Sequence, residues 1–402
     1  MGLGSKTVSL AAAAVMTIAG AYLPAAGIVP EFDEAITASA AQVVTPSLRA
    51  GAECGDKLIL YIDNYRSFSD SAEITVRVSG NRFKPITGQK LKSANGKLSF
   101  TSNGKKYLKP YTRYRVNVTV SDGGATASSE IKITTSKNAF YSVKSGTDYY
   151  TLTGGTMRRQ GTLSSSVCRG VLTDARGNSV KGIAVKDTKA EYVKLMIPVK
   201  TSKNSNNEQL YSYKYVYVKT SDASRKSVDS IRSSVANYAV KMSNVRDQKY
   251  VLCGETMSSS VLRSDCSGLT KAGYLKVGCY LEHIADSQAN MSDTLTVYDN
   301  LVRSGSSDGV TTYRLRSSSS RVDLSALRKG DLLFFLCSTN NQSTNPTYIN
   351  DGIGHVGMYV GDGKFVHFTS SYGVTNHPCR VENLRSYESS QLPVVRVVRV
   401  AF

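Results

Sequence analysis

G-H-V-G-M-Y-V-G-D-G-K-F-V-H-F, residues 354–368, is the stretch that decides the fold of the C-terminal part of the chain. Two runs rich in β-branched and aromatic residues flank a central Gly-Asp-Gly, a pattern typical of a β-hairpin. A three-residue loop, with glycine available for the left-handed position, pairs Gly357 with His367. Because side chains alternate along strands, this register predicts that His355 and His367 lie on the same face of the sheet.

Upstream, residues 263–270 read R-S-D-C-S-G-L-T and begin a predicted helix that runs to about Val277. Asp265 is a good N-cap, which places Cys266 in the first turn. There the positive end of the helix dipole favours a thiolate over a thiol, so the sequence predicts a cysteine that is nucleophilic near neutral pH. A thiolate only begins the hydrolysis of an amide, and histidine is the usual group that protonates the leaving nitrogen and activates water.

Three motifs follow one another along the chain: D-C-S-G-L from Asp265, L-x-x-G-D-L-x-F-F over residues 327–335, and the hairpin sequence. Together they resemble the NlpC family of cell-wall cysteine peptidases. The resemblance implies that Cys266 is the nucleophile, that His355 is the general acid and base, and that His367 orients His355. It also implies hydrolysis of a peptide bond in the peptidoglycan stem, commonly between D-glutamate and a diamino acid.

The same resemblance assigns the substrate side of the site to Tyr250, Asp265 and Ser267. In the family an upstream tyrosine lies in a Y-x-x-G-G segment, and Tyr250 matches it. Here Cys253 stands at the first of these glycines, and Ser264 replaces the aromatic residue that often precedes the aspartate. These departures concern the substrate subsites and leave the cysteine and histidine pattern intact.

The fold predicted for residues 228–402 is an α+β papain-like domain with helices on an antiparallel sheet and a groove between the Cys266 helix and the His355 strand. Apolar residues recur in a helical rhythm between Ser230 and Val245, which predicts an amphipathic helix that opens this domain. No cysteine spacing fits a C-x-x-C zinc site, so no metal and no cofactor are implied.

Residues 43–136 show short alternating strands broken by turn residues, which predicts a small β-sandwich. The pattern L-x-P-x-T-x-Y-x-V from Leu108 to Val116 resembles that of fibronectin type III domains, in which a tyrosine hydroxyl, here that of Tyr114, holds a corner of the sandwich to upstream backbone. Since such a domain says little about function, we expect it to act as a spacer.

Residues 139–223 predict a small β-barrel-like domain whose last strand, Y-V-Y-V-K-T-S-D-A, resembles bacterial SH3-like wall-binding modules. A stripe of four tyrosines occurs at every second position, so their rings share one strand face: Tyr211, Tyr213, Tyr215 and Tyr217. Such a face suits stacking on sugars. Because aromatic stripes usually pack in the interior, we favour the interpretation that these rings form the half-buried side of the barrel. The sequence therefore predicts a multidomain protein with two β domains before the catalytic one.

Residues 1–40 read as a signal peptide, with Lys6 before an uncharged run rich in alanine and glycine and with Ala38-Ser39-Ala40 as the cleavage pattern. The alternative is an uncleaved anchor, because the uncharged run is long enough to span a bilayer, and only then would the membrane be a partner. Cleavage removes one lysine and three acids and raises the net charge from +19 to +21.

This charge predicts partners among anionic polymers outside the cell, namely peptidoglycan and other wall polymers. The basic residues form no run of the kind that binds nucleic acid, so no nucleic-acid partner is predicted. Seven cysteines in an exported chain leave at least one unpaired within the chain, and their connectivity stays open.

The sequence thus predicts a secreted, wall-associated peptidoglycan hydrolase. Two alternatives remain. A papain-like amidase that cuts between sugar and peptide would use the same cysteine and histidine, and a wall-binding or adhesion protein would carry an inactive peptidase domain.

Overall fold

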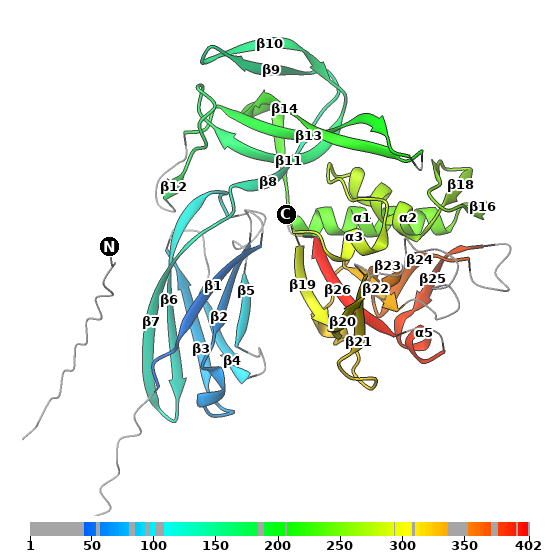
Figure 1. The fold of residues 1–402 in the computed structure, drawn as a ribbon. Helices are drawn as coiled ribbons and strands as arrows, with labels where there is room; N and C mark the ends of the chain where they lie inside the picture. The colour runs from blue at the N-terminus through cyan, green and yellow to red at the C-terminus, as the bar shows by residue number, and fades with distance from the viewer. Residues whose placement is uncertain are drawn as a thin grey trace, which may run out of the picture. The chain divides into compact units, whose positions relative to one another are not determined.

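The computed structural model (Figure 1) describes residues 44–53, 57–79, 85–92, 96–100, 108–183, 189–205, 207–292, 294–307, 310–336, 353–370, 377–390 and 393–400. Most of the described elements are strands, with few helices. The predicted signal peptide lies outside the described residues. No described helix has both the length and the apolarity that crossing a membrane requires.

Two sheets make up the N-terminal part. The first pairs three antiparallel strands: β1 (Leu48–Glu53), β2 (Lys57–Ile62) and β5 (Lys97–Phe100). The second holds five: β3 (Glu73–Val78), β4 (Ile86–Lys90), β6 (Thr112–Asp122), β7 (Ala125–Thr134) and β12 (Gly182–Ile183). The hydroxyl of Tyr114 accepts a hydrogen bond from the backbone N–H of Lys109 at 2.7 Å, the upstream contact that the sequence predicts. The fibronectin-like assignment itself stays a prediction.

The middle part is one seven-stranded sheet in the order β10-β9-β14-β13-β11-β8-β15. Its strands are β8 (Asn138–Val143), β9 (Thr147–Thr153), β10 (Thr156–Leu163), β11 (Ser166–Thr173), β13 (Tyr192–Lys203), β14 (Gln209–Lys219) and β15 (Ala223–Lys226). The tyrosine stripe lies on β14 and is not uniform, because Tyr217 is 6% exposed and Tyr215 is 48% exposed. The likeness to SH3 modules stays a prediction.

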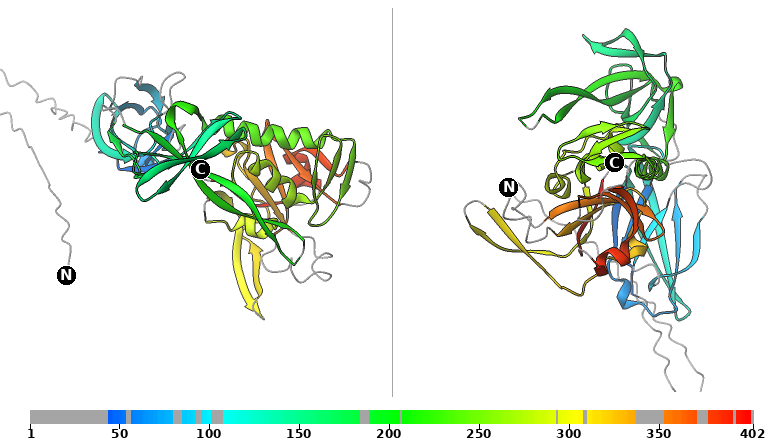
Figure 2. Two further views of the ribbon diagram at one scale, coloured as in Figure 1. Left: turned by 90° about the horizontal axis from the view of Figure 1, so that it is seen from above. Right: turned by 90° about the vertical axis from the view of Figure 1, so that its right-hand side faces the viewer.

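The C-terminal part is built on an antiparallel six-stranded sheet in the order β19-β26-β22-β23-β24-β25, as the sequence predicts. Its strands are β19 (Thr294–Asp299), β22 (Leu332–Leu336), β23 (Ile353–Gly361), β24 (Lys364–Phe368), β25 (Cys379–Asn383) and β26 (Val394–Val400). A small sheet of β16 (Asp247–Tyr250), β17 (Glu255–Met257) and β18 (Val261–Ser264) precedes helix α2, and the hairpin β20 (Leu301–Ser307) and β21 (Val310–Leu315), yellow in Figure 2, extends away from the main sheet.

Helices cover both faces of this sheet (Figure 1). One face packs against α1 (Val228–Ser243), α2 (Cys266–Leu275) and α3 (Ala285–Ala289), and its side chains include Val356 and Met358. The other face packs against α5 (Leu384–Ser390) through Tyr387, which lies with Phe335 and Phe365. Alternation along each strand sends neighbouring residues to opposite layers, so consecutive positions of β23 face different cores.

The register of the β23–β24 hairpin is the predicted one, because Gly357 pairs with His367. The loop differs from the prediction. Gly361 pairs with Lys364, so the turn has two residues, and Asp362 and Gly363 both have positive φ, of 53° and 69°. An irregularity between Tyr359 and Gly361 takes up the extra residue. A bulge beside a tight turn therefore gives the same register as a three-residue loop.

Candidate active site

Helix α2 begins at Cys266 and is capped by Asp265, as predicted. Asp265 Oδ1 accepts the backbone N–H of Gly268 at 2.7 Å and the hydroxyl of Ser267 at 2.9 Å, while Oδ2 accepts the N–H of Cys253 at 2.7 Å. Burial opposes ionisation, but the hydrogen bond and charge of His283 and the backbone donors outweigh it and hold the pKa of Asp265 below its usual range. The predicted substrate residues Asp265 and Ser267 are therefore bonded to each other and buried.

The Cys266 side chain is only 6% exposed and belongs to the hydrophobic cluster on the helix side of the sheet. Burial raises the pKa of the Cys266 thiol to about 12, and the neighbouring charge of Asp265 adds to the rise. Backbone N–H groups at the helix start act in the opposite direction but are outweighed. The predicted preference for a thiolate is therefore wrong for the ligand-free site, because desolvation exceeds the effect of the helix terminus.

The two predicted catalytic histidines lie together. His355 Nε2 and His367 Nδ1 are 2.8 Å apart, and their rings meet edge to face with centroids 5.0 Å apart. Burial is the main cause that lowers the pKa of both rings, and each is therefore neutral near pH 7. A neutral imidazole is the form that accepts a proton, which suits His355 for the role of a base.

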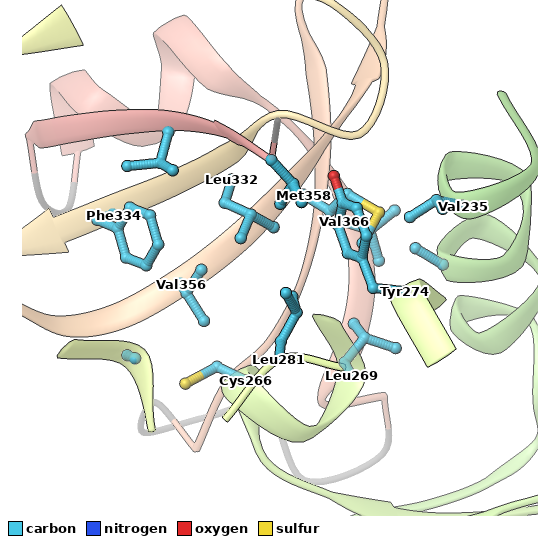
Figure 3. Close-up of a cluster of buried hydrophobic side chains, with 14 of the residues drawn as sticks. Val235, Cys266, Leu269, Tyr274, Leu281, Leu332, Phe334, Val356, Met358 and Val366 are labelled. Carbon is cyan, nitrogen blue, oxygen red and sulfur yellow. The ribbon is translucent and has the colours of Figure 1, made fainter. Parts of the chain in front are cut away.

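Cys266 meets the His355 strand through the residue that follows the histidine. The backbone N–H of Val356 is one of the donors that stabilise negative charge on the Cys266 sulfur. Val356 and Cys266 share the helix-side cluster, and Figure 3 shows the sulfur turned away from Leu269. His355 points to the other layer, where its ring lies 5.7 Å from that of Phe335. The sulfur therefore lies at the backbone of the strand that carries His355, and its negative charge would also act on Tyr387, whose ring meets that of His367 edge to face.

The layer around His367 contains three residues that the sequence did not suggest: Glu382, Arg380 and Tyr387. Glu382 Oε1 lies 3.5 Å from His367 Nε2, and Arg380 forms an ion pair with the same carboxylate. The ring of Tyr387 meets His367 edge to face at 5.1 Å. The alternation R-V-E in β25 places Arg380 and Glu382 on one face of the strand. Only the pairing of β25 with β24 shows that His367 is their neighbour on that face.

The third predicted substrate residue, Tyr250, lies on the helix side of the sheet. Its half-buried ring is 5.7 Å from that of Phe368. The nearby Cys253 has φ 59°, the left-handed region that glycine adopts without strain. This conformation explains why the motif that Tyr250 matches carries a glycine there. The sequence shows that a cysteine replaces the glycine of the motif. Only the backbone conformation shows that this cysteine is strained.

Behind α2 lies a polar network that sequence reasoning missed. Lys271 Nζ donates to the backbone oxygen of Gln209 at 3.0 Å and to Glu255 Oε1 at 2.5 Å. His283 Nδ1 lies 3.5 Å from Glu255 Oε1 and 3.8 Å from Glu208 Oε1. Glu208 and Gln209 come from the β13–β14 hairpin, so this hairpin contributes to the surroundings of the cysteine helix.

The same hairpin borders a cavity of about 420 Å³ that Gly268, Lys271 and Ala272 of α2 also line. Lys200, Lys203 and Lys276 lie along it, with Tyr211 and Tyr238 as aromatic walls. Among the described residues, no group of three or more His, Cys, Asp or Glu side chains is placed to hold a metal ion.

Comparison with known proteins agrees with the motifs. Residues 247–392 match the model of the NlpC/P60 family, so the chain carries a domain of that family over this range. Members of this family are generally cysteine peptidases or amidases. No curated protein matches the chain. Among solved structures, NlpC2 from Trichomonas vaginalis is 14% identical, with a TM-score of 0.31 and an alignment that covers 89% of this chain and 100% of that one.

Proposed function

We propose that the protein is an exported peptidoglycan hydrolase that cleaves a stem-peptide amide bond, between D-glutamate and a diamino acid, with Cys266, His355 and His367. The NlpC/P60 domain at residues 247–392 supports the class of reaction. The observation that carries the choice of residues is the 2.8 Å contact between His355 and His367 on the strands next to the cysteine helix. The amidase and the inactive adhesion protein are the alternatives.

In the proposed reaction the Cys266 thiol passes its proton to His355 as the sulfur attacks the scissile carbonyl carbon. A new C–S bond forms, and the carbonyl electron pair moves to oxygen. Backbone N–H groups at the start of α2 stabilise that oxyanion. His355 then donates its proton to the leaving nitrogen, and the C–N bond breaks to leave an acyl-enzyme.

Water completes the cycle. His355, neutral again, removes a proton from the water that attacks the thioester carbonyl, and the proton returns to the cysteine sulfur as the C–S bond breaks. His367 holds the His355 ring through the Nδ1 to Nε2 contact. A neutral thiol in the resting site means that this proton transfer accompanies the attack and does not precede it.

Location and partners follow from the sequence. The signal peptide predicts export, and a net charge of +21 after its removal supports association with the anionic wall. The basic surface would raise the local concentration of enzyme at its polymeric substrate.

Purified peptidoglycan of known stem composition tests the proposal. We expect that the wild type releases fragments, that Cys266→Ser and His355→Ala release none, and that a chelator changes nothing. A free amine on the diamino acid identifies an endopeptidase, whereas a free L-alanine amine identifies an amidase and replaces the bond proposed here. Peptidoglycan that remains intact with folded wild-type protein would contradict hydrolysis and support the adhesion alternative.

A further inference from the structure

A carboxylate lies on the same face of the sheet as the two histidines. Strand β25 pairs with β24 so that Arg380 lies opposite His367 and Glu382 lies opposite Phe365. Residues that oppose each other across an antiparallel pair share a face, and so do residues two apart on one strand. His355, His367, Arg380 and Glu382 are therefore on the same face of the sheet.

Glu382 is the acid that His367 faces. His367 Nε2 is fully buried and has no hydrogen-bond partner among the described residues, and Glu382 Oε1 lies 3.5 Å away from it. The Glu382 side chain keeps 23% of its surface exposed, and Arg380 forms an ion pair with the same carboxylate oxygen. A shift of about half an ångström would bring nitrogen and oxygen to hydrogen-bond distance.

The charges around His367 favour one protonation pattern. Four titratable or charged groups face the ring: His355 on β23, Arg380 and Glu382 on β25, and Tyr387 on α5. Burial lowers the pKa of His367, and Glu382 opposes this only in part, so the ring stays neutral. Contact with His367 holds the pKa of Glu382 below its usual range, so that side chain stays a carboxylate.

A carboxylate only accepts hydrogen bonds, and this decides the positions of the protons. Beside Glu382, the neutral His367 ring carries its proton on Nε2 and leaves Nδ1 as an acceptor. His355 Nε2 lies 2.8 Å from that acceptor and must therefore carry the proton of its own ring. The remaining nitrogen, His355 Nδ1, then has a free lone pair. A general base needs such a lone pair.

We propose that Glu382 is a positioning residue that fixes the tautomers of His367 and His355, so that His355 Nδ1 is the basic nitrogen. The inference rests on the proposed function, because it assigns a role within the same cysteine and histidine site. Aromatic rings of Phe335, Phe365 and Tyr387 lie against the pair. Arg380 holds the carboxylate in place and limits its pull on the proton.

Glu382→Gln tests the inference because it keeps the size of the side chain but adds an N–H donor. The amide can donate to His367 Nε2, which moves the proton of His367 to Nδ1 and that of His355 from Nε2 to Nδ1. We expect kcat to fall on the order of 10²-fold with little change in KM, within the range of general acid–base contributions. Glu382→Asp, which keeps the carboxylate, should recover part of the loss.

Glu130→Gln is the matched control, since Glu130 pairs with Arg115 on neighbouring strands at 3.3 Å, far from the histidines in sequence and on another sheet. It should leave kcat and folding unchanged. If both glutamine variants lose activity equally, the effect of Glu382→Gln is not specific to the histidine pair and the inference fails.

Nitrogen chemical shifts of the imidazole rings give a readout that needs no turnover. With only four histidines in the chain, ¹⁵N-histidine spectra of the Cys266→Ser protein at pH 7 should show His355 protonated at Nε2, and adding Glu382→Gln should move that proton to Nδ1. Identical tautomers with and without Glu382 would overturn the inference even if the protein hydrolyses peptidoglycan. If Glu382→Gln shifts the tautomers but the wild type hydrolyses no peptidoglycan, only the proposed function is refuted.

Discussion

His283 Nε2 lies 3.0 Å from Asp265 Oδ1, so a histidine with no place in the sequence motif is hydrogen-bonded to the residue that caps the helix that begins at Cys266. Both side chains are buried. The carboxylate that results has four neighbours through its two oxygens: two backbone N–H groups, one hydroxyl and the imidazole. The start of the cysteine helix therefore depends on an ionised Asp265.

This dependence predicts a loss of stability in acid. Since the pKa of Asp265 is lower in the folded protein than in the unfolded chain, its contribution is present above the ordinary aspartate pKa, near 4. It is lost as the pH falls through the folded pKa. The difference in unfolding free energy between wild type and Asp265→Asn should therefore shrink from pH 6 to pH 3. Denaturant titrations at both values measure it, and a constant difference would argue that Asp265 has the same pKa in both states.

The buried thiol predicts an unusual response to alkylation. With a pKa of about 12 for Cys266, the thiolate is a small minority at neutral pH. Its reaction with iodoacetamide should then rise about tenfold per pH unit between about pH 6 and pH 9. The rate is followed by mass spectrometry of the Cys266 peptide in ligand-free protein. A plateau through neutral pH would reveal a preformed thiolate and imidazolium pair instead.

Within the tyrosine stripe, the same change from tyrosine to phenylalanine should affect the free energy of unfolding unequally at two positions. The hydroxyl of Tyr213 accepts the backbone N–H of Tyr280 at 3.0 Å and Nη2 of Arg169 at 3.2 Å. Its removal in Tyr213→Phe leaves these donors without that acceptor and should cost about 1–3 kcal/mol of unfolding free energy. Tyr215→Phe, at a site 48% exposed, should change stability by less than about 0.5 kcal/mol. Thermal melts compare the two, and equal losses would count against this contact.

Wall association should weaken with salt. Exposed charges are screened beyond ~8 Å at physiological ionic strength, and attraction between a chain of net charge +19 or more and an anionic wall falls further as salt rises. Sedimentation of the Cys266→Ser protein with purified walls at low and high salt measures this without digestion. Equal binding at both concentrations would point to uncharged contacts such as sugar stacking.

The hairpin sequence was sufficient to predict the register that unites His355 and His367, because a Gly-Asp-Gly turn between alternating strands allows few pairings. The position of Cys266 at the start of a capped helix was equally predictable, because it depends only on neighbouring residues in the sequence. The raised pKa of Cys266 was not predictable, since it depends on the strand that covers the sulfur. Glu382 was not predicted for a similar reason, because the pairing of β25 with β24 is what brings it close to His367.

The β13–β14 hairpin makes the C-terminal part dependent on residues far before it. Lys271, in the middle of the cysteine helix, donates to the backbone oxygen of Gln209 and to Glu255. A fragment cut at the family boundary would keep every motif residue and yet lose the Gln209 acceptor and the Glu208 carboxylate beside His283. To keep these contacts, a transfer of the NlpC/P60 domain to other partner domains would therefore need to carry the hairpin with it.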